Sequence, residues 1–471
     1  MMLNDQNVNI QIIISVITGC IVLALLTLHH QKKISAIETL LYGFATQTYA
    51  IELLGPSIST LYVISFIFLV DEIRIFVTKG IRFSSRTLVL LLVPLFSVIV
   101  VSVVLIFDNS FFEFKSHQFG ILLTPSFFYL KQYLPLFAIA SKIYREAPKY
   151  STDHFYNTIQ KTAILSCYIA IAQYFIHYSI GNQYIDQLIG LKSRYIFQFH
   201  GIDFVRVQAF CTEPKNFSAL LALSVPLLLR NGRYIYAFLA SILAIMTLGQ
   251  TFPTMVFISV LTLLIFARFS TVRLNLISSF VTFILILKII FSFSSLIVDS
   301  YSEKNSNLIN SILFDRAVKR YSDIEDSTIK DILGIPLQRD LEAPVINYLV
   351  DHPWMFLTGY GPANSAYIPS EYWKGEWNYS IRSEKDVPNH MNMRWIFYIA
   401  EFGIIVFLVL WMGLTGIKAK KFERNFYSFL LLCLFVIEIE VFAVIMFALL
   451  CADRQASSLP FKKNKSLAVA I

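Results

Sequence analysis

The sequence has few charged residues, few cysteines and no sign of a cleaved leader. Charged residues make up 15% of the 471 and hydrophobic residues 56%, whereas about 25% of a soluble chain is charged. No two of the five cysteines stand in CxxC spacing, so neither a zinc site nor a disulfide framework is indicated. Residues 1–9 lack the basic start of a signal peptide, and no small-residue cleavage site follows. We therefore expect the first apolar run to remain as a span.

Long apolar runs fill most of the chain and predict an all-α fold, a polytopic membrane bundle of about 12–13 spans. A span needs about 20 apolar residues. No repeat, low-complexity tract or linker-bounded soluble domain is visible. The predicted spans lie near residues 10–28, 35–54, 57–78, 87–107, 119–141, 156–177, 214–230, 233–250, 251–268, 272–298, 393–416 and 426–451.

The last apolar run allows two interpretations. Glu438 and Glu440 interrupt it, and a break there would give two short spans and a C-terminus inside the cell. The alternative is one long tilted helix with two glutamates facing the interior of the bundle.

Lysines and arginines gather in alternate loops, and loops rich in these residues stay in the cytoplasm. The formal charge of +8 therefore reflects short basic loops and not a nucleic-acid surface. The loops at 108–118, 179–213 and 299–390 are expected outside, on the periplasmic side of a bacterial inner membrane. The basic set is Lys32, Lys33, Arg74, Lys79, Arg82, Arg86, Lys142, Arg145, Lys149, Arg230, Arg233, Arg268, Arg273, Lys418, Lys420, Lys421 and Arg424.

One long polar stretch, residues 299–390, interrupts the apolar pattern. Its backbone groups would lack partners in lipid, so we expect an extramembrane cap. The chain then divides into a membrane bundle at 1–298, a periplasmic cap loop at 299–392, and C-terminal spans with a cytoplasmic tail at 393–471. The cap is rich in aromatic residues, which could stack on sugar rings or form a small core of the cap itself. They are Trp354, Tyr367, Tyr372, Trp373, Trp377 and Tyr379.

Residues 206–217 form the first candidate for chemistry. Pro214 fits the first turn of a helix, and backbone donors at a helix start can hold an anion. Arg206 adds a planar fork suited to phosphate oxygens, and Glu213 and Asn216 stand close by in sequence. The alternative is a proline-initiated helix with an interfacial arginine.

A second candidate lies early in the cap. Arg316, Lys319 and Arg320 share one helical face at i, i+3 and i+4. This pattern favours either a clamp for pyrophosphate or a solvated basic face.

Two lysines lie inside apolar runs, where a charge is costly and often marks a ligand path. Lys131 is the stronger candidate because the polar residues Gln132 and Tyr133 follow it. Lys288 can instead extend its ammonium group toward the interface.

Two polar residues mark the span that follows the cap. His390 lies at its mouth and can take a proton from a sugar hydroxyl near neutral pH, unless it is only a polar boundary residue. Glu401 lies about three turns further along, where a buried carboxylate should be protonated, paired or functional. No carboxylate cluster has metal-binding spacing, so we expect neither a metal nor another cofactor.

Three stretches, taken in order, resemble the O-antigen polymerase and O-antigen ligase superfamily of bacterial membrane glycosyltransferases. Residues 206–217 resemble the family's arginine followed by a Pro-Asn-type helix start. Residues 351–364 are similar to its Gly-x-Gly-x-x-Asn turn in the late periplasmic loop. His390 and Asn392, with Glu401, resemble the His-Asn…Glu-x-Gly-Ile box that opens the next span. The resemblance covers roughly residues 200–450.

The resemblance implies a fold of the lipid-donor glycosyltransferase type. The donor would be a glycan linked to undecaprenyl pyrophosphate in the bilayer, with no nucleotide sugar. Arg206 and Arg316 would hold the pyrophosphate, and His390 would lie near the acceptor hydroxyl. The residues expected to bind substrate are Arg320, Lys131, Glu213, Asn216, Tyr360, Asn392 and Glu401.

The chain departs from the family pattern at three places. Lys215 separates the proline from the asparagine, Met391 separates the histidine from the asparagine, and residues 250–254 lack the usual Ser-Arg pair. These departures favour a specialised polymerase over the ligase. We therefore expect an O-antigen polymerase of lipopolysaccharide biosynthesis that transfers the glycan with inversion, with a chain-length regulator as a membrane partner. The alternatives are the ligase of the same superfamily, and a flippase or transporter of lipid-linked oligosaccharide, which Lys131 and Lys288 would fit.

Overall fold

The computed structural model describes a chain that is mostly helical. The described residues are 5–51, 58–79, 85–107, 142–143, 145–146, 149–191, 196–199, 202–247, 253–256, 258–260, 331–332, 335–337, 342–362, 364–373, 391, 393–414, 421–436 and 450. Within them, the only sheets are three antiparallel pairs of short strands. The predicted span near 272–298 and the interruption at Glu438 lie outside the described residues.

Three helices of the described part are long and apolar enough to cross a membrane. They are α1 (Asp5–His30), α6 (Thr152–Ile180) and α17 (Arg394–Leu414). The apolar part of α1, Ile10–His30, has 21 residues and extends about 32 Å at 1.5 Å per residue, close to the roughly 30 Å of a hydrocarbon core. Large apolar side chains such as Phe175 on α6 are exposed, as expected for a lipid-facing surface. The helices therefore indicate a membrane protein with more than one candidate span.

Most other described helices coincide with predicted apolar runs. α8 (Pro214–Arg230) has the predicted bounds and carries Pro214 in its first turn, which confirms that expectation. The first turn tolerates proline because its N–H groups have no partner within the helix. The others are α3 (Thr60–Lys79), α4 (Ser85–Phe107), α9 (Tyr234–Met246) and α18 (Lys421–Val436).

The predicted helical span over 35–54 is wrong in its length. α2 (Ala36–Ala45) has only 10 residues, about 15 Å, which is half of a hydrocarbon core. A capping box starts it: Glu38 N–H donates to Ser35 Oγ (3.2 Å), and Ser35 N–H donates to Glu38 Oε2 (2.8 Å).

The chain after α2 turns into a short hairpin instead of continuing as a helix. β1 (Ala50–Ile51) pairs with β2 (Ile58–Ser59). The backbone N–H of Thr48 donates to the carbonyl of Phe210 (2.8 Å), in the loop before α8. The chain therefore leaves the helix where it can bond to a loop that is distant in sequence.

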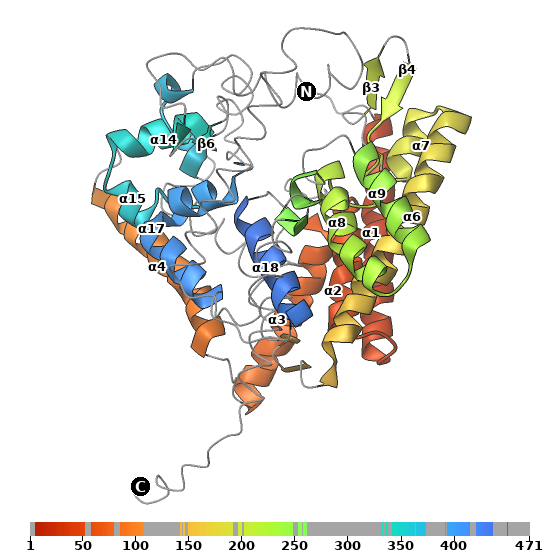
Figure 1. Ribbon diagram of the computed structural model, residues 1–471, viewed down its shortest axis with the longest axis horizontal. Coiled ribbons are helices and arrows are strands. Elements are labelled where there is room, and N and C mark those ends of the chain that lie inside the picture. Colours follow the sequence, from red (N-terminus) through yellow and green to blue (C-terminus); the bar gives the residue numbers. More distant parts are fainter. Residues whose placement is uncertain are drawn as a thin grey trace, which may run out of the picture.

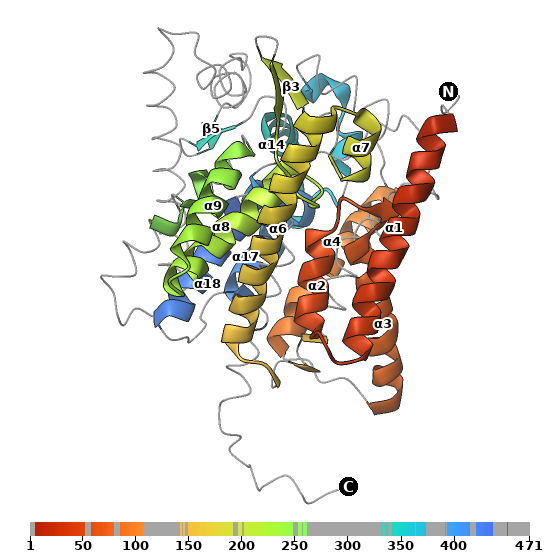
Figure 2. The same ribbon diagram turned by 90° about the vertical axis from the view of Figure 1, so that its right-hand side faces the viewer.

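The helices form two groups around a continuous apolar core (Figure 1). α6 packs against α2 and α8, and α8 packs against α9. α17 packs against α4 and against α15 (Met355–Thr358). In Figure 1 the α4–α15–α17 group lies on the left and the α6–α8–α9 group on the right. Figure 2 shows α1 and α6 running along most of the height of the molecule.

Hydrogen bonds identify which helix ends lie together. At one end, Ser35 Oγ lies 3.0 Å from His154 Nε2, which joins the starts of α2 and α6. At the other end, the Tyr49 hydroxyl donates to the carbonyl of Leu188 (3.1 Å), which joins the segment after α2 to α7 (Gln183–Leu188). The two helices therefore run side by side in the same direction.

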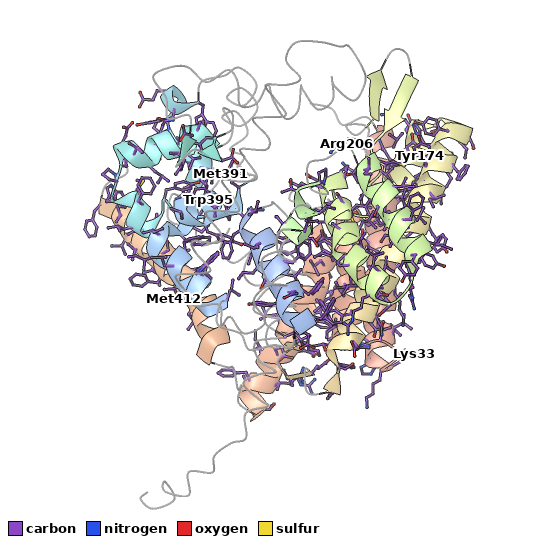
Figure 3. All side chains as sticks on the ribbon, viewed as in Figure 1. Lys33, Tyr174, Arg206, Met391, Trp395 and Met412 are labelled. Atoms are coloured by element: carbon purple, nitrogen blue, oxygen red, sulfur yellow. The ribbon has the colours of Figure 1, made fainter. Side chains whose placement is uncertain are left out.

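We call these two ends the Lys33 end and the Arg206 end. Figure 3 places Lys33 near the bottom of the molecule, and Arg206 and Met391 near the top. Charged side chains pair at the Lys33 end, where Lys142 Nζ lies 3.9 Å from Asp71 Oδ2. Lys33 and Arg206, which the sequence predicts on opposite sides of a membrane, thus lie at opposite ends of the molecule (Figure 3). The orientation in a membrane stays a prediction.

Candidate functional site

Half of the predicted site residues lie in the described part of the chain. Arg206, Glu213 and Asn216 belong to the loop and first turn of α8, and Tyr360 and Glu401 belong to the second helix group. The other candidates lie outside the described residues, and their roles stay predictions: His390, Arg316, Arg320, Lys131 and Asn392.

The loop before α8 is buried and held by side-chain amides. It follows the hairpin of β3 (Ile196–Phe199) and β4 (Ile202–Val205). Gln173 of α6 donates through Nε2 to the carbonyls of Ile189 (2.5 Å) and Ala209 (2.8 Å). Gln208 Nε2 donates to the carbonyl of Gly190. These bonds fix the loop that carries Arg206, although sequence analysis singled out neither glutamine.

Arg206 is half-buried and anchored at the end of α9. Its Nε donates to the carbonyl of Thr247 (2.7 Å), the residue that caps the C-terminus of α9. This bond uses one of the five N–H donors of the guanidinium group and fixes the plane of the fork. Arg206 is therefore a positioned cation at the Arg206 end of the bundle.

Glu213 and Asn216 take part in starting α8. The extended Glu213 accepts backbone bonds from Asn216 (3.1 Å) and Phe217 (3.3 Å), while its carboxylate lies 3.1 Å from Lys215 Nζ. Asn216 Nδ2 donates to Thr212 Oγ1 (2.6 Å), and its buried Oδ1 has no partner in the described part of the chain. The roles of Glu213 and Asn216 in substrate binding stay predictions beside these structural contacts.

A turn of the cap is inserted into a break in α17. The break lies at Gly403, whose φ of 84° and ψ of 162° are not helical. Tyr360 N–H donates to the carbonyl of Ala400 (2.8 Å), and Gly361 N–H donates to the carbonyl of Glu401 (3.1 Å). The turn therefore supplies donors to two carbonyls next to the break. Without these donors, the two carbonyls would be unsatisfied in an apolar interior, which is costly.

Two glycines, Gly359 and Gly403, allow this close approach. We call the contact between the turn and α17 at these two residues the glycine junction. A Cβ on Gly359 would lie 2.3 Å from the carbonyl oxygen of Glu401, and one on Gly403 would lie 2.1 Å from that of Leu357. Both glycines also have positive φ, at 75° and 84°. The Gly-x-Gly turn and the Glu-x-Gly box, separate in sequence, thus meet in one structural unit.

The start of α17 is tied to the same unit. α14 (Glu342–Asp351) carries the fully buried Glu342, whose Oε1 accepts the backbone N–H of Met393 (3.2 Å). A carboxylate is favourable at a helix N-terminus because it satisfies a backbone donor there. Met391 is buried as well, so the positions on both sides of Asn392 are fixed. No local sequence pattern predicts this role of Glu342, because the two helices that it joins lie far apart in the chain.

Aromatic residues of the cap mostly build its core. Trp354, Tyr367, Tyr372 and Trp373 belong to the main apolar cluster or pack against it, while the two remaining cap aromatics lie outside the described residues. Tyr372, in η5 (Ser370–Tyr372), donates its hydroxyl to Asp351 Oδ2 (2.8 Å). Burial and this carboxylate raise the pKa of Tyr372 to about 12. For the described cap aromatics, packing is therefore the observed role.

The described candidate residues form two groups. Arg206, Glu213 and Asn216 lie with α8, whereas Tyr360 and Glu401 lie together at the glycine junction. Figure 1 shows α8 and α17 in different halves of the bundle. Within the described residues, no three His, Cys, Asp or Glu side chains gather closely enough to hold a metal ion.

Comparison with known proteins gives no relative. No family model matches the chain, and neither a curated protein nor a solved structure shows significant similarity to it. The function of this chain is therefore inferred from its own residues and their contacts.

Proposed function

We propose that this chain is a membrane glycosyltransferase of the O-antigen polymerase type. It would transfer a glycan from undecaprenyl pyrophosphate to a lipid-linked repeat unit at the periplasmic leaflet of the inner membrane. The glycine junction is the observation that carries the proposal. It unites two stretches that resemble the superfamily, 351–364 and 401–404, and the bond between Glu342 and Met393 adds the segment beside the third stretch.

In the proposed reaction, the acceptor hydroxyl attacks the anomeric carbon of the donor glycan. The bond from that carbon to the diphosphate oxygen breaks, and the diphosphate leaves with the electron pair. Arg206 stabilises the developing negative charge, together with Arg316, Arg320 and Lys131. His390 orients the acceptor hydroxyl and takes its proton. Because diphosphate is a good leaving group, this chemistry does not require a metal.

The placement of Arg206 supports this role. Its guanidinium is held by a backbone bond, so less conformational freedom is lost when it binds an anion. Arg206 and Met391, the residue after His390, both lie toward the top of the molecule, opposite Lys33 (Figure 3). Arg206, as the cation that binds the diphosphate, and His390, as the base for the acceptor hydroxyl, would then face the same leaflet.

Chain growth by the purified, reconstituted protein on lipid-linked repeat units tests the proposal. We expect Arg206→Ala to lower the rate about 10²–10³-fold, as for the loss of one preorganised donor to a developing anion. Arg206→Lys should retain part of the rate, because it keeps the charge but loses the fork. Arg233→Ala is the matched control, because it removes an exposed arginine at the Lys33 end.

Three results would separate the alternatives. Full activity of Arg206→Ala removes this arginine from the mechanism. Transfer to a lipid core instead of a repeat unit identifies the ligase. Flux of lipid-linked oligosaccharide across sealed liposomes, without new glycosidic bonds, identifies a transporter.

A further inference from the structure

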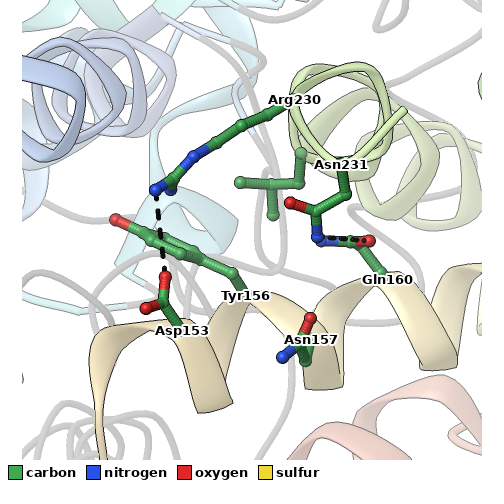
Figure 4. A pocket seen from close by; sticks show the side chains of 7 residues that line it. Asp153, Tyr156, Asn157, Gln160, Arg230 and Asn231 are labelled. Carbon is green, nitrogen blue, oxygen red and sulfur yellow. Dashed lines mark hydrogen bonds and ion pairs between the residues drawn. The ribbon is translucent and has the colours of Figure 1, made fainter. Parts of the chain in front are cut away.

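A polar cavity lies at the Lys33 end of the bundle, opposite the proposed active site. Its volume is about 280 Å³. One face of α6, the last turn of α8 and the residue that caps α8 line it, through Asp153, Tyr156, Asn157, Gln160, Leu227, Arg230 and Asn231 (Figure 4). Pockets for small molecules usually measure about 300–1,000 Å³. The cavity therefore has room for a small polar group but not for an oligosaccharide.

The lining contains a buried donor that lacks a partner. Gln160 is 1% exposed, and its Oε1 accepts a bond from Asn231 Nδ2 (3.2 Å). That bond fixes which way the amide faces. Gln160 Nε2 has no hydrogen-bond partner among the residues that the structure describes. Leaving such a group unsatisfied costs about 1–3 kcal/mol, so a ligand with an acceptor oxygen would be stabilised here.

Arg230 supplies a positioned cation at the same cavity. Its guanidinium carbon lies 4.2 Å from the centre of the Phe422 ring and 5.7 Å from that of Tyr156. The two aromatic rings hold the guanidinium by cation–π attraction. Arg230 is partly exposed, and its Nη2 lies 3.9 Å from Asp153 Oδ1. A loose, exposed ion pair of this kind is weak, so both groups remain able to bind a ligand.

The helix that follows the cavity-lining Asn231 in the chain has an apolar outer surface. α9 begins three residues after Asn231, and Ile235, Phe238 and Ile245 on this helix are 81%, 68% and 60% exposed. Such a stripe suits contact with lipid chains. The lining thus stands where an apolar surface meets a charged turn.

We propose that this cavity binds the headgroup of a zwitterionic phospholipid that carries a phosphate and an ammonium group. The phosphate oxygens accept hydrogen bonds from Arg230 and Gln160 Nε2. The ammonium group pairs with Asp153, at the outer side of the cavity. The acyl chains extend along the apolar outer surface. This site is independent of the proposed glycosyl transfer, because it lies at the other end of the bundle.

The test measures binding of defined lipids to the full-length purified protein by native mass spectrometry. Phosphatidylethanolamine should bind about two- to fivefold more tightly than phosphatidylglycerol, which lacks the ammonium group, because an exposed ion pair contributes at most about 1 kcal/mol. Free phosphoethanolamine and inorganic phosphate should bind more weakly than the lipid. Gln160→Leu and Arg230→Gln should each weaken phosphatidylethanolamine binding about tenfold, the scale of one hydrogen bond to a charged group.

Asp153→Asn separates the two halves of the headgroup. It should abolish the preference for phosphatidylethanolamine over phosphatidylglycerol and leave phosphate-dependent binding in place. Lys161→Gln is the matched control, because Lys161 is exposed, follows Gln160 on α6 and does not line the cavity. Lys161→Gln should bind as the unchanged protein does.

Several outcomes would overturn the proposal. Equal binding of the two lipids to the unchanged protein would remove the role of Asp153. Unchanged binding by Arg230→Gln, whose side chain is exposed enough to be replaced without unfolding, would place the lipid elsewhere. Binding of free phosphate as tightly as the lipid would identify a site for soluble anions instead.

Discussion

The loop before α8 and the turn at the glycine junction solve the same problem in different ways. Each is an irregular segment buried in a helical bundle, where its backbone polar groups need partners. The loop before α8 is tethered by side chains, because Gln173 and Gln208 donate to carbonyls in and around it, in addition to its backbone bond from Thr48 to Phe210. The turn at the glycine junction is satisfied by backbone, because its N–H groups donate to the carbonyls of α17.

The comparison shows what each solution requires from the sequence. A side-chain tether needs one residue type at one position. The side chain bridges the two backbone segments, so the segments themselves do not have to touch. A backbone contact needs small residues on both segments at once, here Gly359 and Gly403. A substitution at either glycine should therefore destabilise the protein more than the loss of one side-chain tether.

Gly403→Ala should have the largest effect. The new Cβ would meet backbone atoms that cannot move independently, and the backbone at Gly403 lies in a region that only glycine adopts easily. We expect a loss of at least about 3 kcal/mol, which combines the strain with the clash. Heating the detergent-purified protein and recording the fraction that stays folded measures this loss.

Two other glycines are controls that separate clash from strain. Gly232 has a positive φ of 70° with open space at its Cβ position, so Gly232→Ala should cost only about 1–2 kcal/mol. Gly19 lies in α1 with nothing within 4 Å of that position, so Gly19→Ala should be neutral or stabilising by about 0.5–1 kcal/mol. If all three substitutions cost the same, the close approach at the junction is not what limits stability.

Gln173→Leu should have an intermediate effect. It removes both donors from the carbonyls of Ile189 and Ala209, and each buried acceptor left unsatisfied costs about 1–3 kcal/mol. Thermal unfolding should show the destabilisation, and proteolysis should cut the loop before α8 sooner. Gln183→Leu is the control, because Gln183 is an exposed glutamine in the first turn of α7. Equal stability of the two variants would contradict the tether.

Ser97→Ala should have the smallest effect. Ser97 of α4 donates its hydroxyl to the carbonyl of Thr358, beside the glycine junction. Losing this single neutral bond should cost about 1 kcal/mol, measured as a lowered midpoint of thermal unfolding. Ser241→Ala is matched to it, because Ser241 donates only within its own helix, to Ala237, and such a bond adds little. A larger loss in Ser241→Ala would argue against the contact between helices.

Local signals predicted the start of α8 correctly. A proline at position 214 is compatible with the first turn and not with the helix interior, and the helix begins there. The long apolar runs of α1, α6 and α17 were recognised for the same reason, since their character is contained in their own residues. The bond between Arg206 and Thr247 could not be predicted in this way, because it joins two helix ends that only the fold brings together.

The break in α17 is the main feature that the sequence did not predict. Gly403 was visible in the middle of the span, but glycine is common inside membrane helices. Only the inserted turn, more than 40 positions earlier in the chain, explains why the helix opens there. The short α2 has a similar origin, because its C-terminal neighbour Thr48 bonds to Phe210, far along the chain.

α6 is one continuous helix of 29 residues that reaches both ends of the bundle. Gln160 lines the headgroup cavity and Gln173 holds the loop that carries Arg206, about 20 Å apart along the helix axis. One residue inserted between them would rotate one glutamine about 100° relative to the other. The length and phase of this segment are therefore constrained from both ends of the bundle, and any rotation of α6 moves both glutamines together.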